Sequence, residues 1–423
     1  MGQESGTRNQ ETGMRQSPLA WIRADEASRL LGVSRATLYA YVSRGFLRSQ
    51  SSPHSPRERL YSHDDVERLR RRTEERRAPD KAAARALQWG MPILESSIAL
   101  IDGHRLYYRG LDASILASSR SLEDVAALIW TGTFEAIPHS RSLVSAASSS
   151  GALPFVARAQ TLLAATAARD PLAFDLRPSG VTATGARVMR LLAKAAIGRD
   201  PGHARIDAAL ARTWRVRDRG ADVVRAALVL CADHELNVSS FTARCVASAG
   251  SHPYAVVIAA LSALEGHRHG GASARAESMI DATRRTRSLP AALTARLQRG
   301  ESIHGFGHPL YRHGDPRARV LLDLLGERYG KSAEYRFVAE LATAAGEITG
   351  EHPNVDFALA AVARVLKLPP GSPLVLFAIG RSVGWIGHAI EQYENGHLIR
   401  PRAKYVGVAP APDGVATSMA SPT

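Results

Sequence analysis

The stretch Gly305-Phe-Gly-His-Pro-Leu-Tyr-Arg-His-Gly-Asp-Pro-Arg-Ala318 places two histidines, two arginines and an aspartate among glycines and prolines. A core helix would carry Leu or Val at many of these positions. Glycine allows positive φ and a close approach of the backbone to a ligand, and proline fixes the turns on either side. The stretch therefore predicts a site in which His308 and Arg317 face one small anion. The alternative is a polar surface loop.

The composition outside this stretch is that of a globular protein, with 423 residues, 45% hydrophobic and 22% charged. The formal charge of +14 favours polyanionic partners such as nucleic acid or phosphorylated ligands, although a solvated basic surface would account for part of it. Cys231 and Cys245 are the only cysteines, which excludes a disulfide framework and fits a reducing cytoplasm. No signal peptide is visible and the apolar runs are shorter than the ~18 residues of a membrane span, so we expect a soluble cytoplasmic protein.

Changes in composition divide the chain into four segments. Residues 1–18 are polar and without periodicity, which is typical of a disordered arm. Residues 19–80 form a small domain, residues 85–408 a large body, and residues 409–423 a flexible tail.

Two helices joined by a tight turn are predicted in the small domain. Gly32 ends the first helix, Ser34 can cap the second, and Leu38 and Val42 face the core four residues apart. The outward face of the second helix would then carry Arg35, Thr37, Tyr39, Tyr41 and Arg44. These side chains suit phosphates and base edges, and a hairpin used only for packing is the alternative.

Three motifs of this domain are similar to those of a known group. They are Leu31-Gly-Val-Ser-Arg-Ala-Thr-Leu38, Arg44-Gly-Phe-Leu47 and Arg59-Leu-Tyr-Ser-His-Asp-Asp-Val66. They resemble the winged helix-turn-helix of the MerR and excisionase group. The resemblance implies DNA as a partner, contacted through Arg35, Thr37, Tyr39 and Arg44.

The large body is predicted to be mainly α-helical. A strand-turn-strand signal around Asp102-Gly103 is followed by apolar residues at helical spacing. The predicted helices cover residues 122–130, 155–169, 185–197, 223–232, 240–250, 254–264, 332–349, 355–366 and 374–391.

Polar islands interrupt these helices. Besides the opening stretch they are Asp233–Asn237, Gly266–Ala272, Pro353–Phe357, Gly380–Trp385 and Ile399–Arg402. Together they supply histidines, a carboxylate and arginines. A carboxylate can remove a proton α to a thioester carbonyl, a neutral histidine can donate to the enolate oxygen, and a second histidine can polarise a ketone. Arginines can hold the carboxylates of the acceptor bidentately.

Metal binding is the alternative reading of the histidines. The pairs His267/His269 and His304/His308 lie outside any His-Glu-x-x-His helix, and no thiolate cluster joins them. We therefore expect no metal.

The islands, in their order along residues 95–407, resemble the motifs of the citrate synthase family. The resemblance implies a large helical domain and a small domain, roughly residues 245–355, that closes over the substrate. It implies His269, His308 and Asp356 as catalytic residues, and His234, His308, Arg317 and Arg381 as ligands of oxaloacetate. Arg400 matches an arginine contributed by the partner subunit, so a homodimer with shared active sites is implied, and Arg312 matches a position that contacts acyl-CoA. No cofactor is implied beyond a coenzyme A thioester as substrate.

The chain departs from the family pattern at two places. Ser273 and Ala274 stand where the family usually has Asn-Glu, and Pro309 stands where a basic residue is usual. Both places lie where acyl-CoA binding and loop closure would be adjusted, so the rate and the acyl preference stay open.

Two classes of function follow from these observations. The first is an enzyme that makes citrate and CoA from acetyl-CoA, oxaloacetate and water, or 2-methylcitrate from propionyl-CoA; the reverse carbon–carbon step of a citryl-CoA lyase uses the same residues. The second is a DNA-binding transcriptional regulator whose helical body senses such metabolites.

Overall fold

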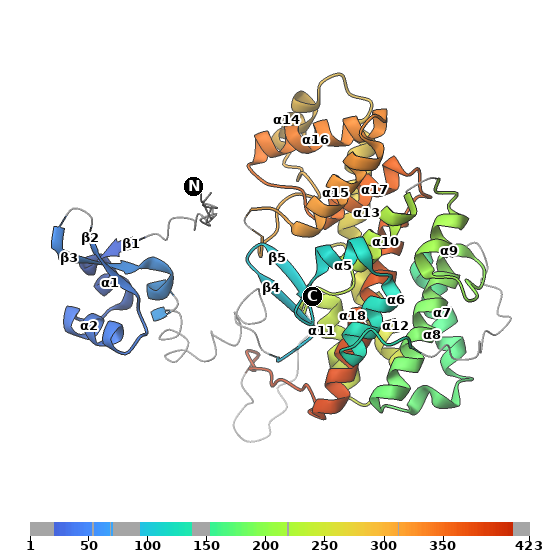
Figure 1. Ribbon diagram of the computed structural model, residues 1–423, viewed down its shortest axis with the longest axis horizontal. Coiled ribbons are helices and arrows are strands. Elements are labelled where there is room, and N and C mark those ends of the chain that lie inside the picture. Colours follow the sequence, from blue (N-terminus) through green and yellow to red (C-terminus); the bar gives the residue numbers. More distant parts are fainter. Residues whose placement is uncertain are drawn as a thin grey trace, which may run out of the picture. The chain divides into compact units, whose positions relative to one another are not determined.

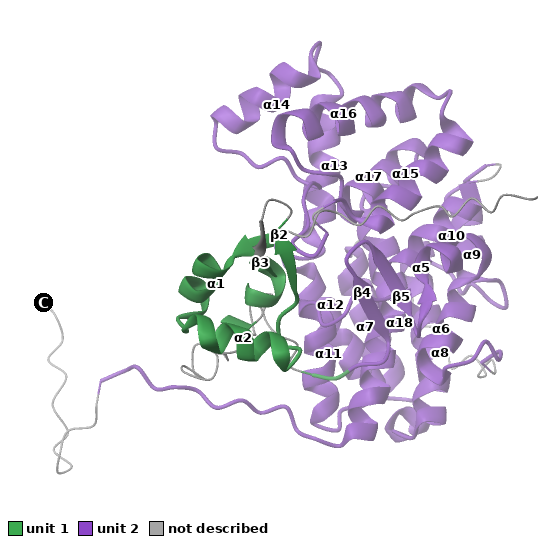
Figure 2. Cartoon of the chain, turned by 60° about the vertical axis from the view of Figure 1, so that its left-hand side comes forward, with its two compact units in different colours: residues 1–95 green, residues 96–423 purple. Residues whose placement is uncertain are grey.

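The computed structural model describes residues 21–52, 55–67, 69–70, 94–137, 153–217, 220–311 and 313–408. The chain divides into two compact units, residues 1–95 and residues 96–423 (Figure 2). The expected arm at 1–18 and the tail at 409–423 lie outside the described residues.

The first unit is a small helix-turn-helix domain with an antiparallel sheet. Its elements are β1 (Trp21–Arg23), α1 (Ala24–Leu31), α2 (Arg35–Ser43), β2 (Ser49–Ser52) and β3 (Ser55–Ser62), with strand order β1-β3-β2. The predicted turn is confirmed: Gly32 ends α1 with φ of 62°, and the Ser34 side chain accepts a hydrogen bond from the Thr37 amide. Leu38 and Tyr61 are fully buried in its core.

The prediction that Tyr41 faces outward is wrong. Tyr41 packs against the core cluster of the first unit, and the ring of Phe46 lies edge-on to it with centroids 6.4 Å apart. The physical reason is helical geometry, because a residue three positions after the buried Leu38 lies on the same face of α2.

The second unit begins with a small antiparallel sheet, β4 (Ala99–Asp102), β5 (Arg105–Tyr108) and β6 (Leu111–Asp112), and is otherwise helical (Figure 1). Its α-helices are α5 (Ala113–Ser119), α6 (Leu122–Thr131), α7 (Phe155–Ala167), α8 (Pro178–Ile197), α9 (Ile206–Thr213), α10 (Gly220–Leu230), α11 (Val238–Ser248), α12 (Pro253–Glu265), α13 (Gly271–Thr283), α14 (Leu289–Gln298), α15 (Pro316–Tyr329), α16 (Ala333–Thr349), α17 (Val355–Val365) and α18 (Ser372–Asn395). The mainly α fold is therefore confirmed. The sequence had not predicted α5, α9, α13, α14 or α15.

Helix α18 is the centre of the second unit. It packs against α6, α8, α10, α11 and α12, and 94% of its most apolar window is buried. By length and composition alone it could cross a membrane, but this burial is that of a core helix. Two glycines allow its close packing: a Cβ at Gly380 would lie 2.4 Å from the Leu228 carbonyl oxygen, and one at Gly384 would lie 2.3 Å from Oδ1 of Asp233.

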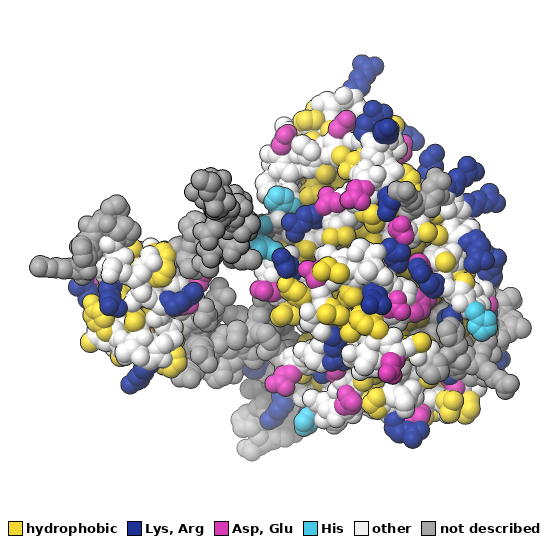
Figure 3. Space-filling model, in the orientation of Figure 1, with side chains coloured by type: hydrophobic (Ala, Val, Ile, Leu, Met, Phe, Trp, Pro, Cys, Tyr) yellow, Lys and Arg dark blue, Asp and Glu magenta, His cyan; other side chains and the backbone are white. Residues whose placement is uncertain are grey.

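Helices α13 to α17 gather at one end of this unit, at the top in Figure 1. The expected small domain of residues 245–355 starts inside α11, yet α11 and α12 pack against α18. Contacts of α13 and α17 with α18 join the two parts. His269 precedes α13, Asp356 lies on α17 and Arg381 lies on α18. Basic and acidic side chains are interspersed over the visible face of the second unit (Figure 3).

Candidate active site

The glycine-rich loop runs beside the start of α17. The Gly307 amide donates to the His352 carbonyl, and the Asn354 amide donates to the Gly305 carbonyl, each at 2.9 Å. Both glycines have positive φ, 88° at Gly305 and 74° at Gly307. A Cβ at Gly305 would also lie 2.8 Å from Cβ of Phe357. The loop therefore needs glycine for its conformation and for its close approach to α17.

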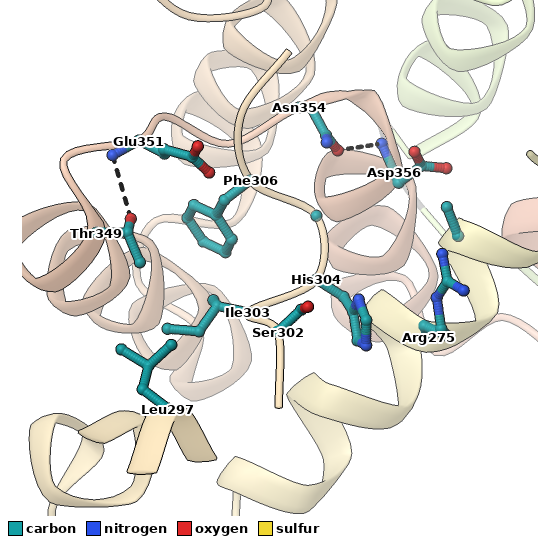
Figure 4. A pocket seen from close by; sticks show the side chains of 12 residues that line it. Arg275, Leu297, Ser302, Ile303, His304, Phe306, Thr349, Glu351, Asn354 and Asp356 are labelled. Atoms are coloured by element: carbon teal, nitrogen blue, oxygen red, sulfur yellow. Dashed lines mark hydrogen bonds between the residues drawn. The ribbon is translucent and has the colours of Figure 1, made fainter. Parts of the chain in front are cut away.

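Asp356 lies in the first turn of α17. The side chain of the N-cap residue Asn354 accepts a hydrogen bond from the Asp356 amide at 3.0 Å. The Asp356 side chain lines a cavity of about 480 Å³, and Arg275 of α13 lies at the same end of it (Figure 4). The hydroxyl of Ser273 donates to Oδ1 of Asp356. Burial raises the pKa of Asp356, and the Ser273 hydrogen bond opposes that rise.

The ring of His269 is anchored just before α13. Its Nε2 lies 2.8 Å from Oγ of Ser239, and the indole N–H of Trp385 donates to the same oxygen at 3.1 Å. The ring of Phe377 stands edge-on to it, with centroids 5.7 Å apart. Burial, followed by the positive charge of Arg381, lowers the pKa of His269 to about 4. The imidazole is therefore neutral at pH 7, and its Nδ1 is the nitrogen that can meet a ligand.

His234, His308 and Tyr311 form an aromatic cluster. The two imidazole centroids are 5.2 Å apart, and Nε2 of His234 lies 2.9 Å from the Tyr311 hydroxyl. The Leu310 amide donates to Nδ1 of His308 at 3.1 Å, so the proton of the neutral ring is on Nε2. Burial, together with the charge of Arg317, lowers the pKa of His308 to about 4. His308 can therefore donate a hydrogen bond from Nε2 while uncharged.

Arg317 and Asp315 form a buried, bidentate ion pair. Nε and Nη2 of Arg317 donate to the carboxylate at 2.9 and 2.7 Å. The same carboxylate caps α15 by accepting from the Arg317 amide, and it accepts from the Val355 amide at the start of α17, both at 3.0 Å. Asp315 thus joins the starts of two helices and holds Arg317 beside the ring of Tyr311, 5.8 Å from its centroid.

Arg381 is the most unusual cation of the site. It is 1% exposed, and its Nε donates to the Cys231 carbonyl at 2.8 Å. Its two terminal nitrogens have no hydrogen-bond partner among the described residues. Burial lowers its pKa from the ordinary value. A buried guanidinium with two unsatisfied donors is typical of a site for a carboxylate or another anion.

Arg381 and His269 share a neighbour: Cζ of Arg381 lies 4.6 Å from the centroid of the Phe377 ring, which stands edge-on to His269. Burial holds the pKa of His234 well below its ordinary value, and the charges of Arg317 and Arg381 lower it further. The charge of Arg317 also acts on Asp356. Because such interactions weaken with distance, one region contains the predicted residues His234, His269, His308, Arg317, Asp356 and Arg381.

Two predicted residues are not part of this group. Arg400 lies in an exposed segment after α18, where the Ile399 amide donates to Oγ of Ser248 at 3.1 Å. Ser248 ends α11, whereas Ser239 of the site begins it, and ten residues of helix span about 15 Å. Arg400 is therefore anchored away from the site of its own chain. Arg312 lies outside the described residues.

Of the predicted DNA-contacting residues, two have side-chain hydrogen bonds within the first unit and two are described by their exposure to solvent. Arg35 is exposed and hydrogen-bonded to Asp25, and the Thr37 hydroxyl lies 3.0 Å from Oγ of Ser34. Tyr39 is 53% exposed and Arg44 is exposed at the end of α2.

Two residues of the site, Ser239 and Arg275, were missed from the sequence, and Ser273 was noted only as a departure from the family pattern. Ser239 belongs to an Asn-Val-Ser triplet in which Asn237 caps α11. A capping residue before an apolar run could have indicated this helix start from the sequence. Ser273 and Arg275 lie on α13, whose small residues gave no apolar period. No group of three or more His, Cys, Asp or Glu residues within the described ranges could hold a metal ion.

The depressed histidine pKa values predict a pH-dependent stability. His269 and His308 each titrate near pH 4 in the folded protein, whereas an unfolded histidine titrates near 6.5. Between these values the unfolded chain binds more protons, so the free energy of unfolding falls as the pH falls from about 6.5 towards 4. We expect His269→Gln to reduce the slope of the free energy of unfolding against pH, measured by urea unfolding between pH 6.5 and 5. The window ends at pH 5 because the protonation of carboxylates dominates at lower pH.

His267→Gln is the matched control, since His267 is an exposed histidine two residues away. It should leave the slope unchanged. Equal slopes in the parent and His269→Gln would contradict the prediction.

Two protein families match the chain. The family model described as "Citrate synthase, C-terminal domain" matches residues 86–402, and the model "MerR HTH family regulatory protein" matches residues 22–73. The two matched regions correspond to the two resemblances seen in the sequence.

Individual proteins agree with this assignment. Citrate synthase 2 of Bacillus subtilis is 30% identical over an alignment of 364 positions, which covers 77% of this chain and 96% of that protein. A 2-methylcitrate synthase of Shewanella oneidensis is 35% identical over 191 residues, covering 44% of this chain and 51% of that protein. The citrate synthase of Thermoplasma acidophilum, solved with carboxymethyl coenzyme A and oxaloacetate, shares the fold with a TM-score of 0.66 at 24% identity, over 78% of this chain and 97% of that one.

Proposed function

The chain belongs to the citrate synthase family, and we propose that it condenses acetyl-CoA with oxaloacetate and water to give citrate and CoA. The observation that carries the proposal is the pair of unsatisfied, buried donors of Arg381, which lie beside neutral histidines. Buried donors beside uncharged imidazoles suit the binding of a small dicarboxylate in its ionised form.

Each group has a role in the proposed reaction. Arg381 and Arg317 hold the carboxylates of oxaloacetate, with His234 beside them. His308 donates from Nε2 to the ketone oxygen and makes the carbonyl carbon more electrophilic.

The second substrate is activated from the other side. Asp356 removes a proton from the methyl carbon of acetyl-CoA. His269, in the tautomer that carries its proton on Nδ1 and accepts the Ser239 hydroxyl at Nε2, donates to the developing enolate oxygen. The enolate carbon attacks the ketone carbon of oxaloacetate and forms the new carbon–carbon bond. The ketone oxygen takes the Nε2 proton of His308 and becomes the hydroxyl of citryl-CoA. Water then cleaves the thioester, so that CoA leaves as the thiol.

The cavity in front of Asp356 suits the thioester. Leu297, Ile303 and Phe306 give it an apolar wall, and Arg275 adds a cation suited to the anionic coenzyme (Figure 4). Burial lowers the pKa of His304, which adds an uncharged imidazole to the same wall. One additional methylene on the acyl group changes binding by only ~1–3 kcal/mol in such pockets. The same site therefore suits propionyl-CoA, which would give 2-methylcitrate.

The test is oxaloacetate-dependent thiol release, measured with acetyl-CoA and propionyl-CoA in parallel and followed by identification of the product acid. We expect release with at least one thioester and a higher kcat/KM with acetyl-CoA. Higher turnover of propionyl-CoA would favour 2-methylcitrate synthesis. No release with either thioester would overturn the proposal.

We propose that the working form is a homodimer. Arg400 is anchored at the far end of α11 from its own site, so its side chain suits the site of a second subunit. The apolar residues Val406 and Val408 that follow it are 88% and 89% exposed, which also suits burial against another chain. Sedimentation at micromolar concentration tests this, and a monomer with full activity would overturn it.

We also propose that the first unit binds DNA. The match to a helix-turn-helix family and the outward-facing Tyr39 and Arg44 on α2 favour it. Arg35 and Thr37 would join them after giving up their contacts within the unit. In this arrangement α2 would lie in the major groove.

Removing one phosphate contact gives a measurable prediction. Arg44→Ala in the full chain should weaken binding to the DNA upstream of its own gene and reduce the slope of log K against log salt by about 1. Arg29→Ala, at an exposed arginine of α1, is the control. Equal affinity of the parent for scrambled DNA, without salt dependence, would refute DNA binding.

A further inference from the structure

The contact between Ser273 and Asp356 joins two helices that are far apart in sequence. The Ser273 hydroxyl donates to Oδ1 of Asp356, and the two residues are 83 positions apart. Ser273 is fully buried, whereas the Asp356 side chain lines the substrate-sized cavity. The hydroxyl therefore reaches the carboxylate from the protein side and not from the cavity.

The backbone around Ser273 is firmly placed. A Cβ at Gly270 would lie 2.6 Å from the Leu264 carbonyl oxygen and 2.8 Å from Cδ1 of Leu374, so the start of α13 is pressed against two neighbouring helices. His269 directly precedes this point, and the Ala272 amide donates to the His269 carbonyl at 2.9 Å. A single turn thus fixes both the imidazole and the hydroxyl that contacts the carboxylate.

Several charged or titratable groups surround the same carboxylate. They are Arg275 on α13, Asp315 and Arg317 at the start of α15, and His304 and Glu351 along the cavity wall. Burial raises the pKa of Asp356, and the Ser273 hydrogen bond is the first of the effects that oppose it, ahead of the charge of Arg317. A hydroxyl that donates to a carboxylate stabilises the ionised form.

We propose that Ser273 is a positioning residue for Asp356. Its hydroxyl occupies Oδ1 of the carboxylate and leaves Oδ2 to take the proton from the thioester substrate. The inference rests on the proposed function. It assigns Ser273 two effects: the hydroxyl fixes the rotation of the carboxylate, and it keeps the carboxylate ionised in a buried site.

The test uses the full chain with Ser273→Ala and Ser273→Thr, and measures kcat and KM by thiol release from pH 5.5 to 9. For Ser273→Ala we expect kcat to fall about 10- to 100-fold, as for a lost hydrogen bond to a charged group. The acid limb of the kcat/KM profile for acetyl-CoA should move to higher pH, because the unassisted carboxylate binds its proton more tightly. The KM for oxaloacetate should stay within about twofold of the parent value. Ser273→Thr keeps the hydroxyl and should restore the position of the acid limb.

Thr283→Val provides a matched control on the same helix. Among the described residues, the buried Thr283 hydroxyl donates only to the Met279 and Ile280 carbonyls, at 2.9 and 3.1 Å. Its removal should leave the acid limb in place. An unchanged acid limb in Ser273→Ala, with or without a fall in kcat, would overturn the positioning role, and so would an equal shift in Thr283→Val. A parent protein without activity would instead overturn the proposed function, and this inference with it.

Discussion

Replacing Asp356 with asparagine is expected to lower kcat by about 10³-fold, within the range of a general base. The amide has nearly the same shape, and its oxygen can still accept the Ser273 hydroxyl. The cap of α17 belongs to Asn354, so the helix itself is not disturbed. The variant therefore removes proton abstraction and little else.

Deuterium exchange separates this step from the later ones. In D₂O the parent should exchange the methyl protons of acetyl-CoA when oxaloacetate or a non-reacting analogue is bound, and Asp356→Asn should not. Asp323→Asn, at an exposed aspartate of α15, is the control and should match the parent. A fully active Asp356→Asn protein would refute the assignment of the base.

Replacing Arg381 with methionine is expected to weaken oxaloacetate binding while raising the stability of the ligand-free protein. Two donors that would meet one carboxylate are lost, so we expect Kd for oxaloacetate to rise about 10²- to 10³-fold. Among the described residues the terminal nitrogens of this buried guanidinium have no hydrogen-bond partner, and the cost of burying them unpaired disappears in the variant. Calorimetric titration and thermal unfolding of the same samples measure the two effects.

Arg317→Met is the informative comparison, because Arg317 is paired with Asp315 at 2.7 Å. Removing one partner of a buried pair leaves the other uncompensated and typically costs 3–5 kcal/mol. The two arginine variants should thus shift the melting temperature in opposite directions. A lower melting temperature for Arg381→Met would show that the guanidinium is satisfied in the free protein.

The fold was predictable where helices follow the ordinary rule of an apolar face and a capped start. The helices α6, α16 and α18 agree with their predicted ranges to within a few residues. The exceptions have physical causes. Helix α14 buries only Leu293 among its described residues, so its sequence shows no apolar stripe. The start of α13 is formed by Gly271, Ala272 and Ser273, which pack by being small and not by being apolar.

The site was predictable as a set of residues but not as an arrangement. The resemblance of their motifs to those of the citrate synthase family identified His269, His308 and Asp356. No local pattern could show that the terminal nitrogens of Arg381 lack partners, since this depends on what surrounds the middle of α18. The contact of Ser273 with Asp356 was hidden for a similar reason, because it depends on how two helices cross.

The carboxylate of Asp315 caps α15, pairs with Arg317 and accepts the Val355 amide that begins α17. Its two oxygens thereby take part in the capping of one helix, the placement of another and the positioning of the arginine that we propose binds oxaloacetate. In a mutational scan, no allele at position 315 should separate a growth defect caused by misfolding from one caused by poor substrate capture. Suppressors elsewhere in the gene could restore abundance without restoring affinity, so both phenotypes would map to this one position.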